Sequence, residues 1–506
     1  MVDSRTKNTK RNIIFGWMYK IITLLLPFLN RTVILAYLGA GYVGISGLFS
    51  SIIQVLSLAE LGFSSAIVFS LYKPISDGDT DTVCALLNYF KRIYKVVGLV
   101  FFGGGLLLLP FLEHLVSGSY PSDVNIYILY LMYIFESGLS YFLFGYKSAI
   151  ITAKQREDIL SKLHILVAVL KNVLQFALLL IFKNFYLYVT SSLVTTVLNN
   201  ILIAIITNKY FPEYKCRGSI EKKKKSDIRK QVFGLLCSKV AEKTRNSVDT
   251  VIISAFCGLG AVAIFNNYFM IFASVFGIVF AVSSGMQASV GNSIAQKTSE
   301  ENYKGLKNFK FMYFWISCWF STCLLCLYQP FMSIWAGEDL MLPNFEMALF
   351  CVYFFAICLN SIRDVYFEGC GLWSKAKKTY LLETIVNLIL NIVLGKMFGI
   401  AGILIATIFV VIVINGIMRT YVLFKNYFNI SPIPFLATEL IYFISFAVVG
   451  AITYFVCSFI TQSGITELVL KGLLCVVLPN VIMVCLFFKT DSFKKMIGMV
   501  KRIIKV

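Results

Sequence analysis

Charged residues and histidines are scarce in this sequence, and each shortage excludes a class of protein. Only 14% of the 506 residues are charged, 58% are hydrophobic, and the mean hydropathy is +0.79. A soluble domain of this composition would expose large apolar patches to water. The chain has only two histidines, His114 and His164, so few residues are available for a catalytic mechanism that depends on histidine. The composition therefore excludes a soluble globular protein and argues against a histidine-dependent enzyme.

Long hydrophilic loops are also missing from the predicted outer face. Each outer loop is about ten residues long or shorter. A membrane polysaccharide polymerase or a lipid-linked glycosyltransferase needs a sizeable outer loop or domain to carry its acid and base residues. No glycine-rich phosphate loop, metal-ligand cluster or nucleophile triad stands out either. We therefore expect no enzymatic activity and no cofactor.

Cysteine is present, but its distribution does not suggest a metal site. Most of the 13 cysteines fall inside apolar runs, where the side chain acts as a small hydrophobe. Cys323 and Cys326 form a CxxC motif, but no second ligand pair or hydrophilic loop accompanies it. We therefore expect no metal or redox role for this motif.

Long apolar runs are what the sequence has in abundance. The hydrocarbon core of a bilayer is roughly 30 Å thick, so a spanning helix takes about 20 apolar residues. We predict an all-α polytopic membrane protein with about fourteen transmembrane helices. The spans are residues 13–38, 45–72, 96–116, 124–146, 163–182, 186–207, 232–256, 262–284, 309–335, 344–368, 380–397, 399–424, 435–459 and 467–488.

The residues behind the formal net charge of +20 are distributed according to the predicted membrane topology. The lysines and arginines lie between apolar spans rather than on a soluble surface, so nucleic acid is not an expected partner. Alternate loops hold most of them, including the run Lys222–Lys225, whereas the other loops hold only Lys183 and Lys396. By the positive-inside rule, this asymmetry predicts a multi-pass protein of the cell membrane with both termini in the cytoplasm.

The tail from Ser492 has an amphipathic pattern. Phe493, Met496, Ile497 and Val500 share one helical face, and lysines occupy the others. We predict an interfacial helix that binds the lipids of the anionic inner leaflet. A frayed basic tail is the alternative.

Two segments of the chain resemble each other. Residues 31–43 can be aligned with residues 249–262 after one insertion. The alignment superimposes two glycine pairs, Gly39 on Gly258 and Gly41 on Gly260. Spans 1 and 7 therefore correspond in the same orientation, which predicts a parallel repeat.

The repeat predicts two six-helix lobes followed by two C-terminal helices. The predicted domains are an N-lobe at 1–230 with its basic linker, a C-lobe at 231–430, and spans 13 and 14 with the tail at 431–506. In such an architecture a central cleft between the lobes is the natural substrate path.

Spans 1 and 7 carry polar stripes at membrane depth. Ionisable residues there cost at least about 2.5 to 3.5 kcal/mol each, so they should face a watery cavity or a partner. The polar residues of span 1 recur every three or four positions and share one helical face: Lys20, Thr23, Pro27, Asn30 and Arg31. Span 7 has a stripe of its own: Lys239, Glu242, Lys243, Asn246, Asp249 and Thr250.

The stripes have surplus positive charge. Lys239 can pair with Glu242, and Arg245 with Asp249, which leaves the cations of Lys20, Arg31 and Lys243. Because lysine and arginine replace the water lost by phosphate oxygens, the surplus predicts an anionic cargo. With one residue of span 10 added, the candidate substrate-binding residues are Lys20, Arg31, Lys239, Lys243, Arg245 and Arg363.

Carboxylates at membrane depth suggest ion coupling. Glu60, Glu242 and Asp249 could bind a coupling Na⁺ or proton, and the sequence does not choose between these ions. Other buried charges are more simply interhelical salt bridges. Lys171 and Glu383 are the best candidates for that role.

Four segments together resemble Wzx-type polysaccharide flippases of the multidrug/oligosaccharidyl-lipid/polysaccharide superfamily. The first, residues 29–73, begins LNRTVILAYLGAGYVG, and the second is NSVDTVIISAFCGLGAVAIFNNY at 246–268. PFMSIWAGEDLML at 330–342 and a segment at 363–408 that begins RDVYFEGCGLWSKAKKTY complete the set. The resemblance covers roughly residues 10 to 490, and it is the order and spacing of the segments that make it specific.

The resemblance implies fourteen helices in two lobes and transport by alternating access. It implies an undecaprenyl-pyrophosphate-linked oligosaccharide as substrate and contacts with polysaccharide assembly proteins. It also implies a cationic cavity, onto which Lys20, Arg31, Lys243 and Arg363 fall by position. A cation-coupled multidrug exporter of the same superfamily is the alternative, but the basic stripes and the two spans after residue 430 argue against it.

Overall fold

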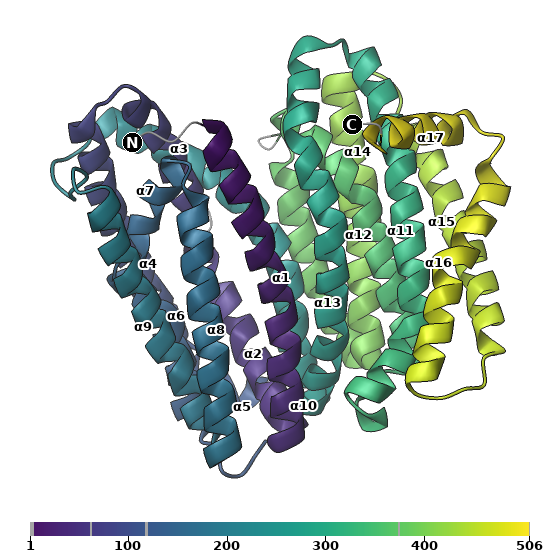
Figure 1. Ribbon diagram of the computed structural model, residues 1–506, viewed down its shortest axis with the longest axis horizontal. Coiled ribbons are helices and arrows are strands. Elements are labelled where there is room, and N and C mark those ends of the chain that lie inside the picture. Colours follow the sequence, from purple (N-terminus) through teal and green to yellow (C-terminus); the bar gives the residue numbers. More distant parts are fainter. Residues whose placement is uncertain (1–4, 61–62, 117–119, 373–374, 505–506) are drawn as a thin grey trace. The chain divides into compact units, whose positions relative to one another are not determined.

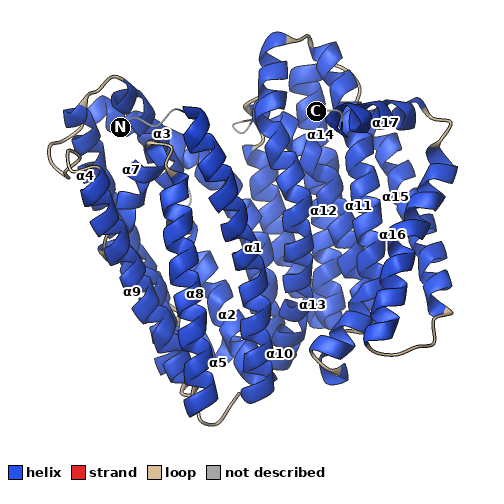
Figure 2. Cartoon of the chain, in the orientation of Figure 1, coloured by secondary structure: helices blue, strands red, loops and turns tan. Residues whose placement is uncertain are grey.

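The computed structural model describes residues 5–60, 63–116, 120–372 and 375–504 and contains only helices and loops within these ranges (Figure 2). Side chains in the helices are described except at 5–14, 17, 24, 59–60, 63–66, 222–227, 229–246, 284–285, 288, 295 and 499–504. The chain divides into two compact units, Met1–Ala263 and Ile264–Val506. The predicted all-α fold class is confirmed.

The first unit contains the helices up to the first part of α10. They are α1 (Arg5–Tyr37), α2 (Ala40–Leu56), a 3₁₀ turn (Ser57–Glu60), α3 (Phe63–Ser76), α4 (Thr80–Leu107), α5 (Leu112–Leu115), α6 (Ile126–Phe142), a 3₁₀ turn (Gly145–Lys147), α7 (Ser148–Ala153), α8 (Glu157–Phe182), α9 (Phe185–Tyr210) and α10 (Lys222–Gln296) as far as Ala263. Helix α8 packs between α1 and α9, and α6 packs against α4 and α9 (Figure 1). Tyr130 and Tyr133 of α6 contact the ring of Phe49 in the core of this unit.

The second unit contains the rest of α10 and the later helices. They are α11 (Ser299–Trp335), α12 (Asn344–Gly369), α13 (Lys377–Phe409), a π-helix (Val410–Met418), α14 (Arg419–Leu423), a second π-helix (Phe424–Phe428), α15 (Ile433–Ser458), α16 (Ile465–Phe487) and α17 (Asp491–Ile504). Helix α11 packs against α12, α15 and α16. The predicted tail helix is present as α17, which also packs against α11 (Figure 1).

Two of the long helices are broken at glycines. The backbone of Gly258 in α10 has φ 84° and ψ 172°, and that of Gly399 in α13 has φ 57° and ψ −135°. A β-carbon on Gly402 would lie 2.0 Å from the carbonyl oxygen of Leu394. In a straight helix these residues would be about 12 Å apart, so the chain folds back on itself after Gly399.

Within the residues that the structure describes, helices overlap each of the fourteen predicted spans. In the described part of the chain, ten helices are long and apolar enough to cross a membrane, and the bent pair Ile126–Phe142 and Gly145–Ala153 makes an eleventh span. The glycine breaks divide α10 and α13 into two spans each, and α2 with α3 supplies the span near 45–72. The protein is a multi-pass membrane protein.

The glycines of the predicted repeat have matching conformations. Gly39, between α1 and α2, has φ 97° and ψ 175°, close to the values at Gly258. Residues with a side chain rarely adopt such a positive φ. The shared conformation supports the alignment of spans 1 and 7.

Candidate functional site

Lys20 of the predicted stripe on α1 is exposed. One turn further along, the Thr23 hydroxyl donates to the carbonyl oxygens of Tyr19 (2.9 Å) and Lys20 (3.0 Å). The Thr23 hydroxyl therefore donates its hydrogen bond within α1. No carboxylate in the described part of the chain pairs with the Lys20 ammonium.

Asn30 joins helices within the first unit. Its Nδ2 donates to Asn172 Oδ1 and, at 3.0 Å, to Gln175 Oε1, both on α8. Gln175 Nε2 in turn donates to Ser192 Oγ on α9 at 2.9 Å. Asn172 and Gln175 are buried, so this amide network holds α1, α8 and α9 together. Asn30 thus has a packing role that the stripe pattern did not predict.

Arg31 is partly buried and makes a contact from α1 to α10. Its Nη2 donates to the carbonyl oxygen of Ala263 at 3.3 Å, within the first unit. A carbonyl satisfies a guanidinium donor without neutralising its charge. Arg31 therefore links α1 to the backbone of α10.

Most of the predicted stripe on span 7 lies outside the described side chains, as does one predicted carboxylate of span 2. The residues concerned are Lys239, Glu242, Lys243, Arg245 and Glu60. Asp249 is described and is buried, with Ser247 and Thr250 buried beside it in the sequence. Ser247 Oγ donates to Gln54 Oε1 at 3.4 Å. The pairs Lys239–Glu242 and Arg245–Asp249 stay predictions.

Arg363 lies inside the second unit, where protein groups surround its guanidinium. The side chain is fully buried. Its donors reach Asp364 Oδ1 (2.7 Å), Gly416 O (2.9 Å), Asn360 Oδ1 (3.1 Å), Thr420 Oγ1 (3.4 Å) and Asn415 Oδ1. In this conformation its donors serve protein acceptors, so a phosphate ligand would have to replace them.

These contacts attach α12 to the π-helix Val410–Met418. Asn360 Nδ2 donates to the carbonyl oxygen of Val411 at 3.1 Å, while Arg363 donates to Gly416. A π-helix disturbs the regular backbone ladder, and such segments occur frequently at functional sites. Two side chains of α12 therefore bind carbonyl groups in the irregular segment.

Two further ion pairs are buried in the second unit. Lys310 on α11 pairs with Glu439 on α15 and donates to Leu359 O at 3.1 Å. Arg419 pairs with Glu383 and lies over the Tyr380 ring, 4.2 Å from its centroid. The sequence analysis did not single out Lys310, Glu439 or Arg419, which lie in the first or last six residues of their predicted spans. The signal that could have identified them is an ionisable residue near the end of an apolar helix.

The predicted salt-bridge roles are confirmed. Lys171 Nζ on α8 lies 3.6 Å from Glu136 Oε1 on α6, and Glu383 pairs with Arg419. Of the predicted site residues with described side chains, Lys20, Arg31 and Asp249 belong to the first unit and Arg363 to the second.

The sequence matches a known family. Residues 9–290, more than half of the chain, match the family described as polysaccharide biosynthesis protein. No curated protein matches the sequence.

Solved structures of transporters share the fold. The lipid II flippase MurJ in its inward closed conformation is 15% identical, with a TM-score of 0.67, and the match covers 94% of this chain and 98% of MurJ. An inward-facing multidrug resistance MATE family transporter of the MOP superfamily is also 15% identical, with a TM-score of 0.60 over 80% of this chain and 96% of the transporter. The Vibrio cholerae MATE transporter VcmN in the bent form is 13% identical, with a TM-score of 0.53 over 81% and 95%.

The resemblance found in the sequence is thus confirmed at the level of the family and the fold. At such low identity the structural matches concern the fold, while the family follows from the sequence match. The chain belongs to the polysaccharide biosynthesis protein family and has the fold of the MurJ and MATE transporters.

Proposed function

We propose that this protein is a flippase for an undecaprenyl-pyrophosphate-linked oligosaccharide. It moves this lipid from the inner to the outer leaflet of the cytoplasmic membrane by alternating access, for surface polysaccharide synthesis. The observation that carries the proposal is the family match over residues 9–290, which includes both polar stripes.

The charge of the stripes supports an anionic headgroup. Lys20 is exposed on an apolar helix, and Arg31 of the same helix donates to the carbonyl oxygen of Ala263. A cation at membrane depth costs at least about 2.5 to 3.5 kcal/mol. A pyrophosphate ligand would offset that cost for Lys20 and give Arg31 a further acceptor, through charge-assisted hydrogen bonds. In the proposed mechanism these two residues and Lys243 hold the pyrophosphate, and Lys239 and Arg245 add to the positive field.

Arg363 has a different place in the proposal. Its present acceptors hold the π-helix, so it binds the headgroup only in a state where those contacts have changed. The lipid tail remains among membrane lipids throughout, and both termini are cytoplasmic. Coupling to Na⁺ or protons would use Glu60, Glu242 or Asp249, and polysaccharide assembly proteins would receive the product.

The multidrug alternative is less well supported. The MATE structures cover 80% and 81% of this chain, whereas MurJ covers 94%. A cationic drug would also be repelled by the surplus lysines and arginines.

The proposal is tested in a strain that lacks the gene. We expect the triple variant Lys20→Gln, Arg31→Gln, Lys243→Gln to lower surface polysaccharide at least about tenfold, since each charge-assisted hydrogen bond is worth about 1.5 to 3 kcal/mol. The lipid-linked precursor should accumulate in the inner leaflet. Polysaccharide is measured by immunoblot and the precursor by mass spectrometry.

Matched variants separate transport from folding. Lys304→Gln removes an exposed cation that pairs with Glu300, so we expect it to export normally. Lys20→Arg keeps the charge and should retain most activity. If the triple variant is present in the membrane at normal levels and export is unchanged, the proposed headgroup site is wrong.

A further inference from the structure

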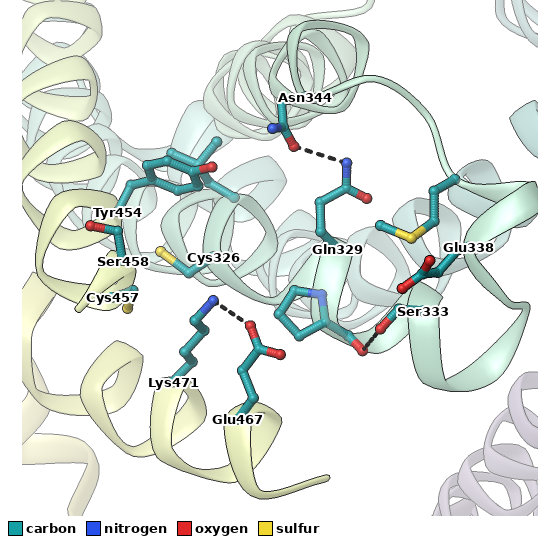
Figure 3. Close-up of a pocket in the computed structure, with 13 residues that line it drawn as sticks. Cys326, Gln329, Ser333, Glu338, Asn344, Tyr454, Cys457, Ser458, Glu467 and Lys471 are labelled. Carbon is teal, nitrogen blue, oxygen red and sulfur yellow. Dashed lines mark hydrogen bonds and ion pairs between the residues drawn. The ribbon is translucent and has the colours of Figure 1, made fainter. Parts of the chain in front are cut away.

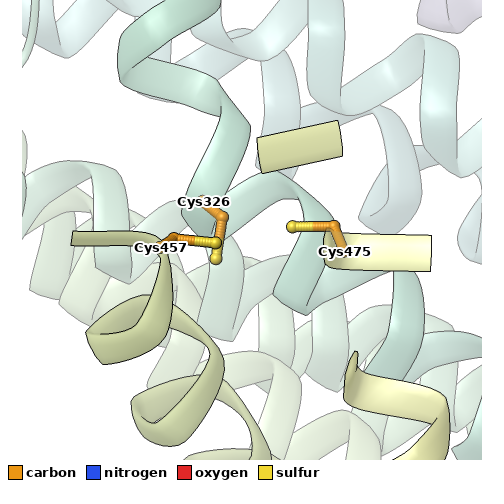
Figure 4. A group of neighbouring side chains, drawn as sticks. All are labelled: Cys326, Cys457 and Cys475. Atoms are coloured by element: carbon orange, nitrogen blue, oxygen red, sulfur yellow. The ribbon is translucent and has the colours of Figure 1, made fainter. Parts of the chain in front are cut away.

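Three cysteine thiols from three helices of the second unit meet at one point. Cys326 lies on α11, Cys457 on α15 and Cys475 on α16 (Figure 4). Their Sγ atoms all lie within 4.8 Å of one another, and all three side chains are buried. None of the three is in a disulfide. The cluster was not visible in the sequence because its members are far apart along the chain.

The spacing suits one metal ion. With metal–sulfur bonds of about 2.3 Å, a planar three-coordinate ion holds its sulfur ligands about 4 Å apart. The three sulfur atoms therefore need to move by less than about an ångström to share an ion. Small rotations of the cysteine side chains supply such a shift.

Neighbouring groups hold the cluster in place. The carbonyl oxygen of Cys475 accepts from Trp319 Nε1 at 2.9 Å and from Cys323 Sγ at 3.7 Å. Leu327 and Leu474 pack against the thiols. Cys323 of the CxxC motif thus fixes the backbone of one thiol residue, whereas Cys326 belongs to the triad itself. Such supporting contacts orient ligands before the ion arrives.

A cavity reaches two of the three thiols. A space of about 550 Å³ is lined by Cys326 and Cys457 together with Glu338, Glu467 and Lys471 (Figure 3). Lys471 Nζ and Glu467 Oε1 are 2.6 Å apart. The carboxylates attract a cation, and the ammonium favours the thiolates that form when bound metal displaces the thiol protons.

We propose that Cys326, Cys457 and Cys475 bind one Cu(I) ion in three-coordinate thiolate geometry. Soft thiolate ligands select Cu(I) and Zn(II). Zinc prefers four ligands, and in the described part of the chain no fourth histidine, cysteine or carboxylate joins the cluster. This site is independent of the proposed transport function.

The test uses the full-length protein in detergent, reduced with a phosphine and freed of metal. Cu(I) is titrated in competition with the chelator bathocuproine disulfonate. We expect one tightly held ion per chain, three sulfur ligands at about 2.3 Å in X-ray absorption, and a higher unfolding temperature. Cys457→Ser and Cys475→Ser should each weaken binding at least about tenfold to a hundredfold. Cys318→Ser, a buried thiol of α11 outside the cluster, should bind as the parent does.

A second measurement avoids dependence on folded variants. In the parent protein, bound Cu(I) should protect Cys457 from alkylation by N-ethylmaleimide, as read by mass spectrometry, while exposed Cys257 stays reactive. If the Cys457→Ser, Cys475→Ser double variant binds Cu(I) as tightly as the parent protein does, the ion binds at another site and the proposal is wrong. If the monodisperse parent protein does not retain Cu(I), the proposal is wrong and the three cysteines serve only as hydrophobic packing. If the site binds Zn(II) in preference to Cu(I), the choice of ion is wrong.

Discussion

At the scale of single residues, the buried charges described in the second unit are held in ion pairs. Lys310 and Glu439 are both largely buried and come from different helices. Taking two charges out of water is costly, and their attraction repays that cost only while both are present. The pair therefore ties α11 to α15 as long as neither partner is removed.

Glu439→Gln should destabilise the protein. It leaves the Lys310 ammonium buried without a carboxylate, and breaking a buried pair in this way costs about 3 to 5 kcal/mol. A thermal unfolding scan in detergent should give a clearly lower midpoint. The double variant Lys310→Met, Glu439→Leu should recover much of the loss, because apolar side chains of similar volume replace the pair. A single variant as stable as the parent would contradict the proposed burial.

At the scale of helices and turns, glycine decides where a long apolar segment reverses. The aligned glycine pairs follow predicted spans 1 and 7, and Gly39 and Gly258 both have a positive φ, which residues with a side chain rarely adopt. The reversal at Gly399 comes between predicted spans 11 and 12. The sequence analysis did not predict the two π-helices after α13, of which the first, Val410–Met418, accepts hydrogen bonds from two side chains of α12.

Gly402→Ala tests the reversal in α13. The added β-carbon would meet the Leu394 carbonyl, a backbone group that cannot rotate away. Overpacking of this kind costs about 1 to 3 kcal/mol, so the unfolding midpoint should fall. Gly472→Ala on α16 is the matched control, since its β-carbon would meet no atom within 4 Å. Because alanine favours helix over glycine, this control should be neutral or slightly stabilising. Equal effects of both changes would argue against the close return.

At the scale of the whole molecule, helix packing within each unit decides which polar residues of the spans take protein partners. Asn30 binds α8 in the first unit, and Arg363 binds a π-helix in the second. The salt bridges of Lys171 and Glu383 were predicted correctly because a lone charge on an apolar helix needs a partner.

The predicted orientation in the membrane gives a further test. Ser219→Cys, in the loop before α10, should resist a membrane-impermeant maleimide in intact cells, while Ser463→Cys, between α15 and α16, should react. The positive-inside rule is the physical reason. Labelling is compared with that of the parent chain, and the opposite pattern would invert the topology.

By itself the sequence determined the membrane class, the number and places of the apolar spans, the glycine turns and the family. These are properties of local segments, since the length of an apolar run and the charge of a loop act on the bilayer without help from distant residues. Only the tertiary structure decided which partners the buried charges take and which thiols meet. Those outcomes depend on the faces that packed helices present to one another, and residues as far apart as Cys326 and Cys475 become neighbours only through that packing.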